Sequence, residues 1–72
     1  MTAKEHNTLL MLASVTPFSF MDIRGVYYLV KNTWHEQRMQ IMKVIIEDAE
    51  KMNISLYESY KLTASIQALI WP

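Results

Sequence analysis

The sequence predicts an all-α protein, and three observations support that fold class. The chain of 72 residues contains one Gly and two Pro, which leaves little turn chemistry for a β-sheet. It is rich in the helix formers Leu, Met, Ala, Glu, Lys and Gln. Apolar residues recur at helical spacing behind pairs of capping residues. We therefore expect one domain, residues 1–72, that folds as a compact bundle of about four short helices.

The first predicted helix covers residues 3–14. It should end before Thr16 and Pro17, because the residue before a proline is pushed out of helical geometry. A second helix, residues 19–31, begins with the cap pair Ser19 and Asp22. Its apolar stripe consists of Phe20, Ile23, Tyr27 and Val30.

The third predicted helix begins with the cap pair Thr33 and Glu36 and ends near Asn53, a residue type that tolerates the left-handed conformation found after helix C-termini. Its apolar stripe consists of Trp34, Ile41, Ile45, Ala49 and Met52. Ser55 and Glu58 form the cap pair of a fourth helix, which runs toward the C-terminus. The long third helix is the expected backbone of the bundle.

The corner at residues 47–62 resembles the turn of a helix-turn-helix motif. In that motif a small residue packs at the end of the first helix, Gly or Asn turns the chain, and apolar residues anchor the second helix. The residues in these positions are Ala49, Asn53, Ile54 and Leu62. Asp48 and Ser59 depart from the pattern, because both positions are normally apolar. A plain corner between two helices would show much the same string of residues.

Charge and composition disfavour several classes of function. Seven Lys plus Arg balance seven Asp plus Glu, so the chain lacks the positive field that attracts proteins to nucleic acids or anionic membranes. The absence of Cys excludes disulfides and thiolate chemistry and favours the cytoplasm. No apolar run approaches the ~20 residues that cross a bilayer. We expect no membrane association.

No catalytic, metal or phosphate motif stands out. His6 and His35 lie on different predicted helices and have no metal-binding spacing. Gly25 is the only glycine, so a Gly-rich phosphate loop is excluded. A glycine inside a helix destabilises the helix by up to ~1 kcal/mol relative to Ala. Close packing of another helix at Gly25, or a bend of the helix there, would explain why a glycine occupies this position. We expect no enzyme, no metal and no cofactor.

The apolar content of 51% is high for so small a chain, which hides only about 60% of its surface on folding. We therefore expect a protein-binding regulator, inhibitor or adaptor, with another protein or a second copy covering the excess. Tyrosines combine an apolar ring with a polar tip, a character enriched at interfaces; they are Tyr27, Tyr28, Tyr57 and Tyr60.

The predicted partner-binding face lies on the last helix, with an acidic rim on the helix before it. The face consists of Tyr57, Glu58, Tyr60, Lys61 and the anchor Trp71, and the rim of Glu47, Asp48 and Glu50. Such a face could cover a basic nucleic-acid-binding surface, an anti-repressor-like role. The alternative is a dimeric helix-turn-helix transcription regulator. Its second helix offers only Lys61 as a cation, which disfavours DNA binding.

Overall fold

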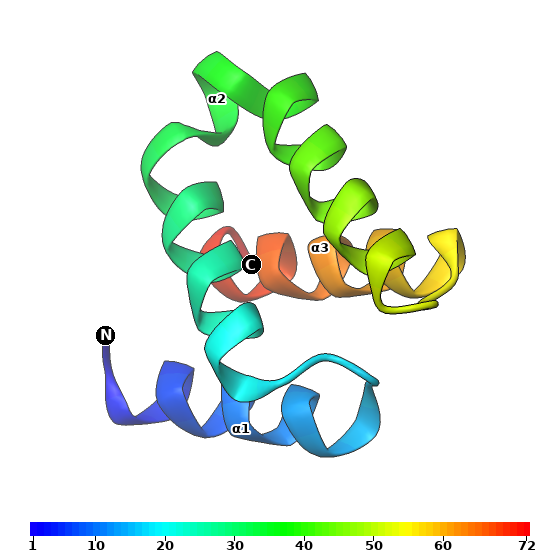
Figure 1. Cartoon of the computed structure of the whole chain (residues 1–72). Helices are drawn as coiled ribbons and strands as arrows, with labels where there is room; N and C mark the ends of the chain where they lie inside the picture. The colour runs from blue at the N-terminus through cyan, green and yellow to red at the C-terminus, as the bar shows by residue number, and fades with distance from the viewer.

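A computed structural model describes all 72 residues and contains three helices and no strand. The helices are α1 (Ala3–Val15), α2 (Phe20–Lys51) and α3 (Leu56–Ile70). In Figure 1, α2 rises from the end of α1, bends back and descends to the corner that begins α3. The radius of gyration is 11.3 Å, close to the value of about 11 Å typical of a compact chain of this length. The predicted all-α class is confirmed.

Local side-chain bonds define the first helix. The Thr2 hydroxyl accepts a hydrogen bond from the Glu5 amide, and the Glu5 carboxylate accepts one from the Thr2 amide. This reciprocal capping box satisfies two amides that have no partner inside the helix. The helix ends at Val15, where the Thr16 amide still donates to the Leu12 carbonyl. The predicted break before Pro17 is confirmed.

The predicted second and third helices are a single kinked helix, so the expected count of four was wrong. Ser19 caps α2 as predicted, accepting from the Asp22 amide at 3.2 Å. Thr33 does not cap a new helix, because its hydroxyl donates to the Leu29 carbonyl at 2.8 Å. No Pro or Gly lies between residues 26 and 36 to stop the helix. The chain instead kinks at Gln37, whose φ of −132° and ψ of 31° are not helical.

The corner between α2 and α3 has the geometry that its residues predict. Asn53 adopts the left-handed conformation, with φ of 58°. The Ile54 amide donates to the Ala49 carbonyl and the Asn53 amide to the Glu50 carbonyl, the bond pattern of a Schellman motif. The Ser55 hydroxyl then caps α3 by accepting from the Glu58 amide. The predicted helix end and restart are both confirmed.

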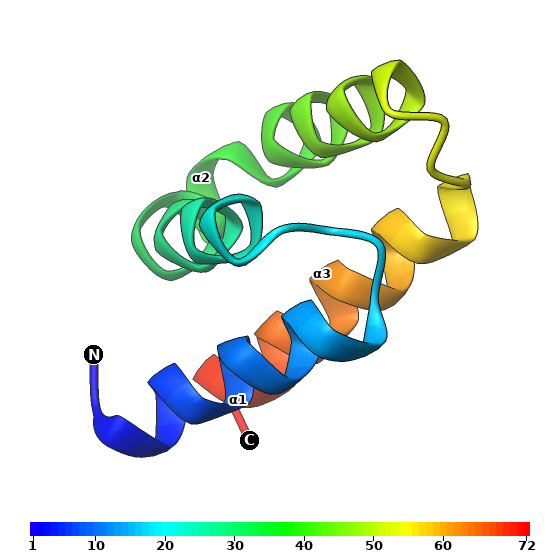
Figure 2. The same ribbon diagram turned by 60° about the horizontal axis from the view of Figure 1, so that its bottom comes forward.

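One hydrophobic core joins the three helices. Twelve apolar side chains form it: Leu9, Leu12, Phe18, Ile23, Tyr27, Val30, Trp34, Ile41, Ile45, Ala49, Leu62 and Ile66. Helix α2 packs on both α1 and α3, and in Figure 2 these two helices lie on the same side of α2. The molecule measures 31 × 29 × 17 Å, so it is only about two helix diameters thick at its narrowest. Most large side chains outside this core keep one side in solvent.

Candidate protein-binding grooves

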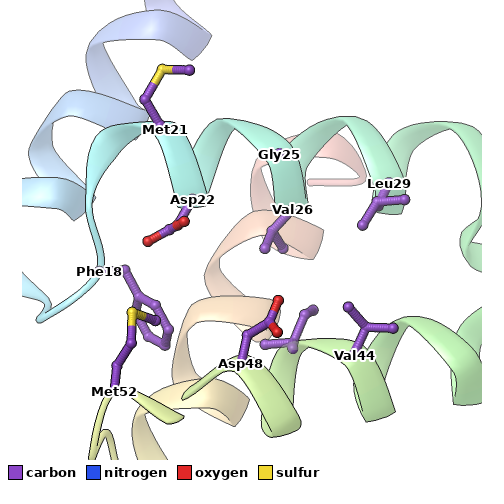
Figure 3. Close-up of a pocket in the computed structure, with 10 residues that line it drawn as sticks. Phe18, Met21, Asp22, Gly25, Val26, Leu29, Val44, Asp48 and Met52 are labelled. Atoms are coloured by element: carbon purple, nitrogen blue, oxygen red, sulfur yellow. The ribbon is translucent and has the colours of Figure 1, made fainter. Parts of the chain in front are cut away.

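A groove runs between the two halves of α2, which the kink at Gln37 sets facing each other (Figure 3). We call it the α2 groove. Its volume is 220 Å³. Its ten lining residues are Phe18, Met21, Asp22, Gly25, Val26, Leu29, Val44, Ile45, Asp48 and Met52. Seven of them are hydrophobic, so the groove is an apolar surface bordered by a few polar groups.

Several apolar side chains around the α2 groove remain accessible to solvent. Leu29 and Val44 point toward each other from opposite walls and are 43% and 44% exposed. Met52 is 46% exposed and lies with buried Phe18 at one end of the groove. Met21 is 68% exposed and points to the outer side of α2. This accessible apolar surface is what a binding partner would remove from water.

Gly25 lies exposed at the edge of the α2 groove. A Cβ atom added there would meet no heavy atom within 4 Å, and its φ is not positive. No helix of this chain packs closely on Gly25, and the bend of α2 lies at Gln37 instead. Both sequence-based explanations for this glycine are therefore wrong within the isolated chain. Gly25 also lines a shallow depression with Met21, Arg24 and Tyr28, so its missing side chain leaves the edge of the groove open to solvent.

Two carboxylates enter the α2 groove from opposite walls. Asp22 and Asp48 both point into the space between the two halves of the helix (Figure 3). The Asp22 carboxylate also accepts a hydrogen bond from the Ser19 hydroxyl at 2.8 Å. The lining contains no Lys, Arg or His. The groove is therefore both apolar and negatively charged.

Part of the predicted partner-binding set gathers in a second depression, on the outer face of α2 and α3. Tyr60 from α3 lines it together with Glu47 and Glu50 from α2. Arg38 and Lys43 line the same depression, so its charges are mixed rather than acidic. We call this surface the α2–α3 depression. The predicted acidic rim is divided, because Asp48 lies in the α2 groove instead.

The other predicted residues line neither depression. Tyr57 is 70% exposed, and Lys61, four residues later on the same side of α3, is also exposed. Glu58 is half-buried, and its Oε2 atom is buried without a hydrogen-bond partner. The Trp71 ring packs against His35 at 5.1 Å between centroids, beside the kink of α2. The predicted partner-binding set is thus spread over several surfaces.

Tyr27, one of the four tyrosines predicted for an interface, belongs to the core instead. It is fully buried, whereas Tyr28, Tyr57 and Tyr60 are exposed. Its hydroxyl donates a hydrogen bond to the Glu5 carboxylate, and Lys31 Nζ donates to the Tyr27 hydroxyl at 3.3 Å. The ring stays inside because these neighbours satisfy its polar tip.

The three hydrogen-bonded side chains Glu5, Tyr27 and Lys31 all have shifted pKa values. The hydrogen bond from Tyr27, followed by that from the Thr2 amide, lowers the pKa of Glu5 to about 2. Burial, followed by the Glu5 carboxylate, raises the pKa of Tyr27, and the hydrogen bond to Tyr27 raises the pKa of Lys31. None of the three lines the α2 groove. Their shifts come from the contact between α1 and α2.

Sequence reasoning missed most of the α2 groove, although part of the signal was present. Val26 and Leu29 lie outside the core stripe of their helix, and Gly25 is a conspicuous residue beside them. Val44 and Asp48 come opposite these residues only because the helix kinks about midway between them. The sequence predicted a break at Thr33, four residues before the kink, but nothing in it indicated that the two halves would face each other.

No group of three His, Asp or Glu side chains lies close enough together to hold a metal ion. None of the helices combines the length and the apolar character that a bilayer-spanning segment requires. No protein-family model, curated protein or solved structure matches this chain.

Proposed function

We propose that this chain is a small non-enzymatic protein-binding module, acting as a regulator, inhibitor or adaptor, which holds a helical segment of a larger protein in the α2 groove. The observation that carries this proposal is the open space at Gly25 among accessible apolar side chains. An amphipathic helix that docks in a groove needs such a surface for its apolar anchors. A glycine in the wall lets the backbone of that helix approach closely.

The size of the α2 groove favours a protein segment over a small molecule. Its 220 Å³ is below the roughly 300–1,000 Å³ of sites for drug-sized ligands. It suits one or two anchor side chains of a partner. Leu29 and Val44 would each contribute roughly 1 kcal/mol when a partner covers their exposed parts. A few such anchors support a reversible complex after the cost of association is subtracted.

The competing docking surface is the exposed face of α3 that includes Tyr57 and Tyr60. These two rings are 70% and 54% exposed, and only Tyr60 lines a depression. The charges near Tyr60 are mixed, so this face has no single electrostatic preference. The lining of the α2 groove is the more apolar of the two, because seven of its ten residues are hydrophobic, against four of the eight that line the α2–α3 depression.

The test is a titration of the isotope-labelled chain with a neutral amphipathic helix of Leu and Gln, followed by amide chemical shifts. We expect the largest shifts at groove residues such as Val26 and Val44. Gly25→Trp should fill the open space and abolish them. Asn7→Trp is the matched control, because Asn7 is exposed on α1 and does not line the groove. Shifts centred on Tyr57 and Tyr60, or equal binding by both Trp variants, would contradict this proposal.

A second candidate function is DNA binding through the corner of α2 and α3. Its support is that Ala49 and Leu62 are buried and Asn53 is left-handed, as a helix-turn-helix requires. Against it, Lys61 is the only cation of α3, and Glu58 would repel phosphate. We expect no shift of duplex DNA even at low salt. A salt-sensitive shift at micromolar protein would favour the DNA-binding function instead.

A further inference from the structure

We propose that the occupant of the α2 groove is a basic amphipathic helix, with Lys or Arg placed beside its apolar anchors. This inference rests on the proposed function and specifies its partner. The argument for it is charge complementarity, since an apolar groove with two carboxylates selects an apolar helix that carries cations. Helices of this chemistry include those that contact nucleic acids, which links the groove to an anti-repressor-like role.

The two carboxylates are placed to receive cations from a helix lying in the groove. Asp22 enters from the first half of α2 and Asp48 from the second, on either side of the apolar surface. None of the lining residues is a cation that could neutralise them. Arg24, two residues after Asp22, lies over the Tyr28 ring at 5.8 Å. Neither Arg24 nor Lys51, three residues after Asp48, lines the groove. A partner's Lys or Arg would therefore meet unneutralised negative charge.

The positions of the two carboxylates along α2 make them unequal. Asp22 lies in the first turn, where the helix dipole stabilises a negative charge, and it also accepts the Ser19 hydroxyl. Asp48 lies near the other end, where the dipole opposes a negative charge. A cation on the partner would relieve this unfavourable placement. Asp48 should therefore contribute more to the preference for a basic helix than Asp22.

A second copy of this chain fits the α2 groove less well. Joining two grooves face to face would bring four carboxylates together, two from each copy. Like charges placed together at an interface oppose association. The charge of the groove thus favours a different, basic protein over self-association.

The experiment compares three synthetic helices of about 15 residues, or roughly four turns, with the same Leu stripe and with Lys, Gln or Glu on the polar side. We expect the Leu/Lys helix to bind about tenfold more tightly than the Leu/Gln helix at low salt, and the Leu/Glu helix to bind more weakly than either. The difference should shrink as salt is added, because these carboxylates are exposed. Calorimetry gives the affinities, and amide chemical shifts give the location.

Matched variants separate the groove from the overall charge of the chain. Asp22→Asn with Asp48→Asn should remove the preference for the Leu/Lys helix and leave Leu/Gln binding unchanged. Glu47→Gln with Glu50→Gln removes the same two charges from the α2–α3 depression and should leave the preference intact. If both double variants lose the preference for the Leu/Lys helix equally, that preference reflects the net charge of the chain and the inference is overturned.

The remaining outcomes distinguish this inference from the proposed function. If all three helices bind equally and shift groove amides, the basic partner is wrong but the protein-binding groove stands. If none of the three binds, both proposals are wrong. If light scattering shows a dimer that Gly25→Trp dissociates, the groove is occupied by a second copy and the basic partner is overturned.

Discussion

The Tyr27 hydroxyl donates a hydrogen bond to the Glu5 carboxylate and so connects the buried stripe of α2 with the first turn of α1. The same carboxylate also accepts the Thr2 amide, which caps α1. One side chain therefore serves both the start of a helix and its attachment to the rest of the fold. The stability of the fold should therefore respond to changes at Tyr27 and at Glu5.

Replacing Tyr27 by Phe should lower the free energy of unfolding by about 1 kcal/mol. The ring remains in the core, but the Glu5 carboxylate loses its donor and Lys31 loses its acceptor. Urea unfolding followed by circular dichroism measures the change. Tyr28→Phe is the control, because Tyr28 is exposed and its removal should change little. Equal stability of the two variants would show that the Tyr27 hydroxyl contributes nothing.

Acid should destabilise the chain partly through Glu5. Its pKa falls from 4.5 to about 2 on folding, so the folded state favours the ionised form. The stabilisation is complete above about pH 4.5 and is lost as the pH falls toward 2. Glu5→Gln keeps a capping side chain but cannot titrate. Its unfolding midpoint should fall less steeply between these pH values, and a slope equal to that of the unmodified chain would contradict the assignment.

Replacing Ser59 by Ala should raise the free energy of unfolding by about 1 kcal/mol. Ser59 is fully buried, and its Oγ atom has no hydrogen-bond partner. A buried hydroxyl without a partner pays a desolvation cost that Ala does not. Thr63→Val is the matched comparison, because the Thr63 hydroxyl does donate to the Ser59 carbonyl at 2.9 Å. That variant should be neutral or destabilised, and a loss of stability in Ser59→Ala would reveal a partner for the hydroxyl.

Replacing Gly25 by Ala should stabilise the isolated chain by roughly 0.5–1 kcal/mol. The residue lies inside α2, its φ is not positive, and an added Cβ meets no neighbouring atom. Thermal unfolding checks this gain. The same substitution should weaken binding of an amphipathic helix in the α2 groove, because the methyl group occupies part of the free space. A destabilised Gly25→Ala chain would mean that the glycine serves the fold.

Replacing Asn53 by Ala should destabilise the corner by about 1 kcal/mol, because Ala lacks the short polar side chain whose local hydrogen bonds let Asn adopt the left-handed conformation. Asn53→Gly should retain or increase stability, since Gly adopts this conformation without a steric cost. Denaturant unfolding of the two variants compares them directly. Equal effects of Ala and Gly would indicate that the turn can change its backbone conformation.

Local signals made much of the fold predictable. Ser19 and Ser55 cap the helices that their positions predict, and Asn53 turns the chain where its residue type allows. The stripe from Ile23 through Ile45 to Ala49 is buried as its spacing indicates, whereas Met52, predicted to continue it, is 46% exposed. Each of these features depends on residues within a few positions of one another. The α2 groove was much less predictable, because only Asp48 of the residues predicted to bind a partner lies in it.

The sequence by itself determined the helical class, the capped helix starts and the apolar stripes, because these follow from interactions over one or two turns. Only the tertiary structure decided that Thr33 lies within a continuous helix and that α2 bends at Gln37. That bend brings Leu29 opposite Val44 and leaves Gly25 open at the same groove. Packing of α2 on both α1 and α3 sets these positions, and such long-range contacts leave no local pattern in the chain.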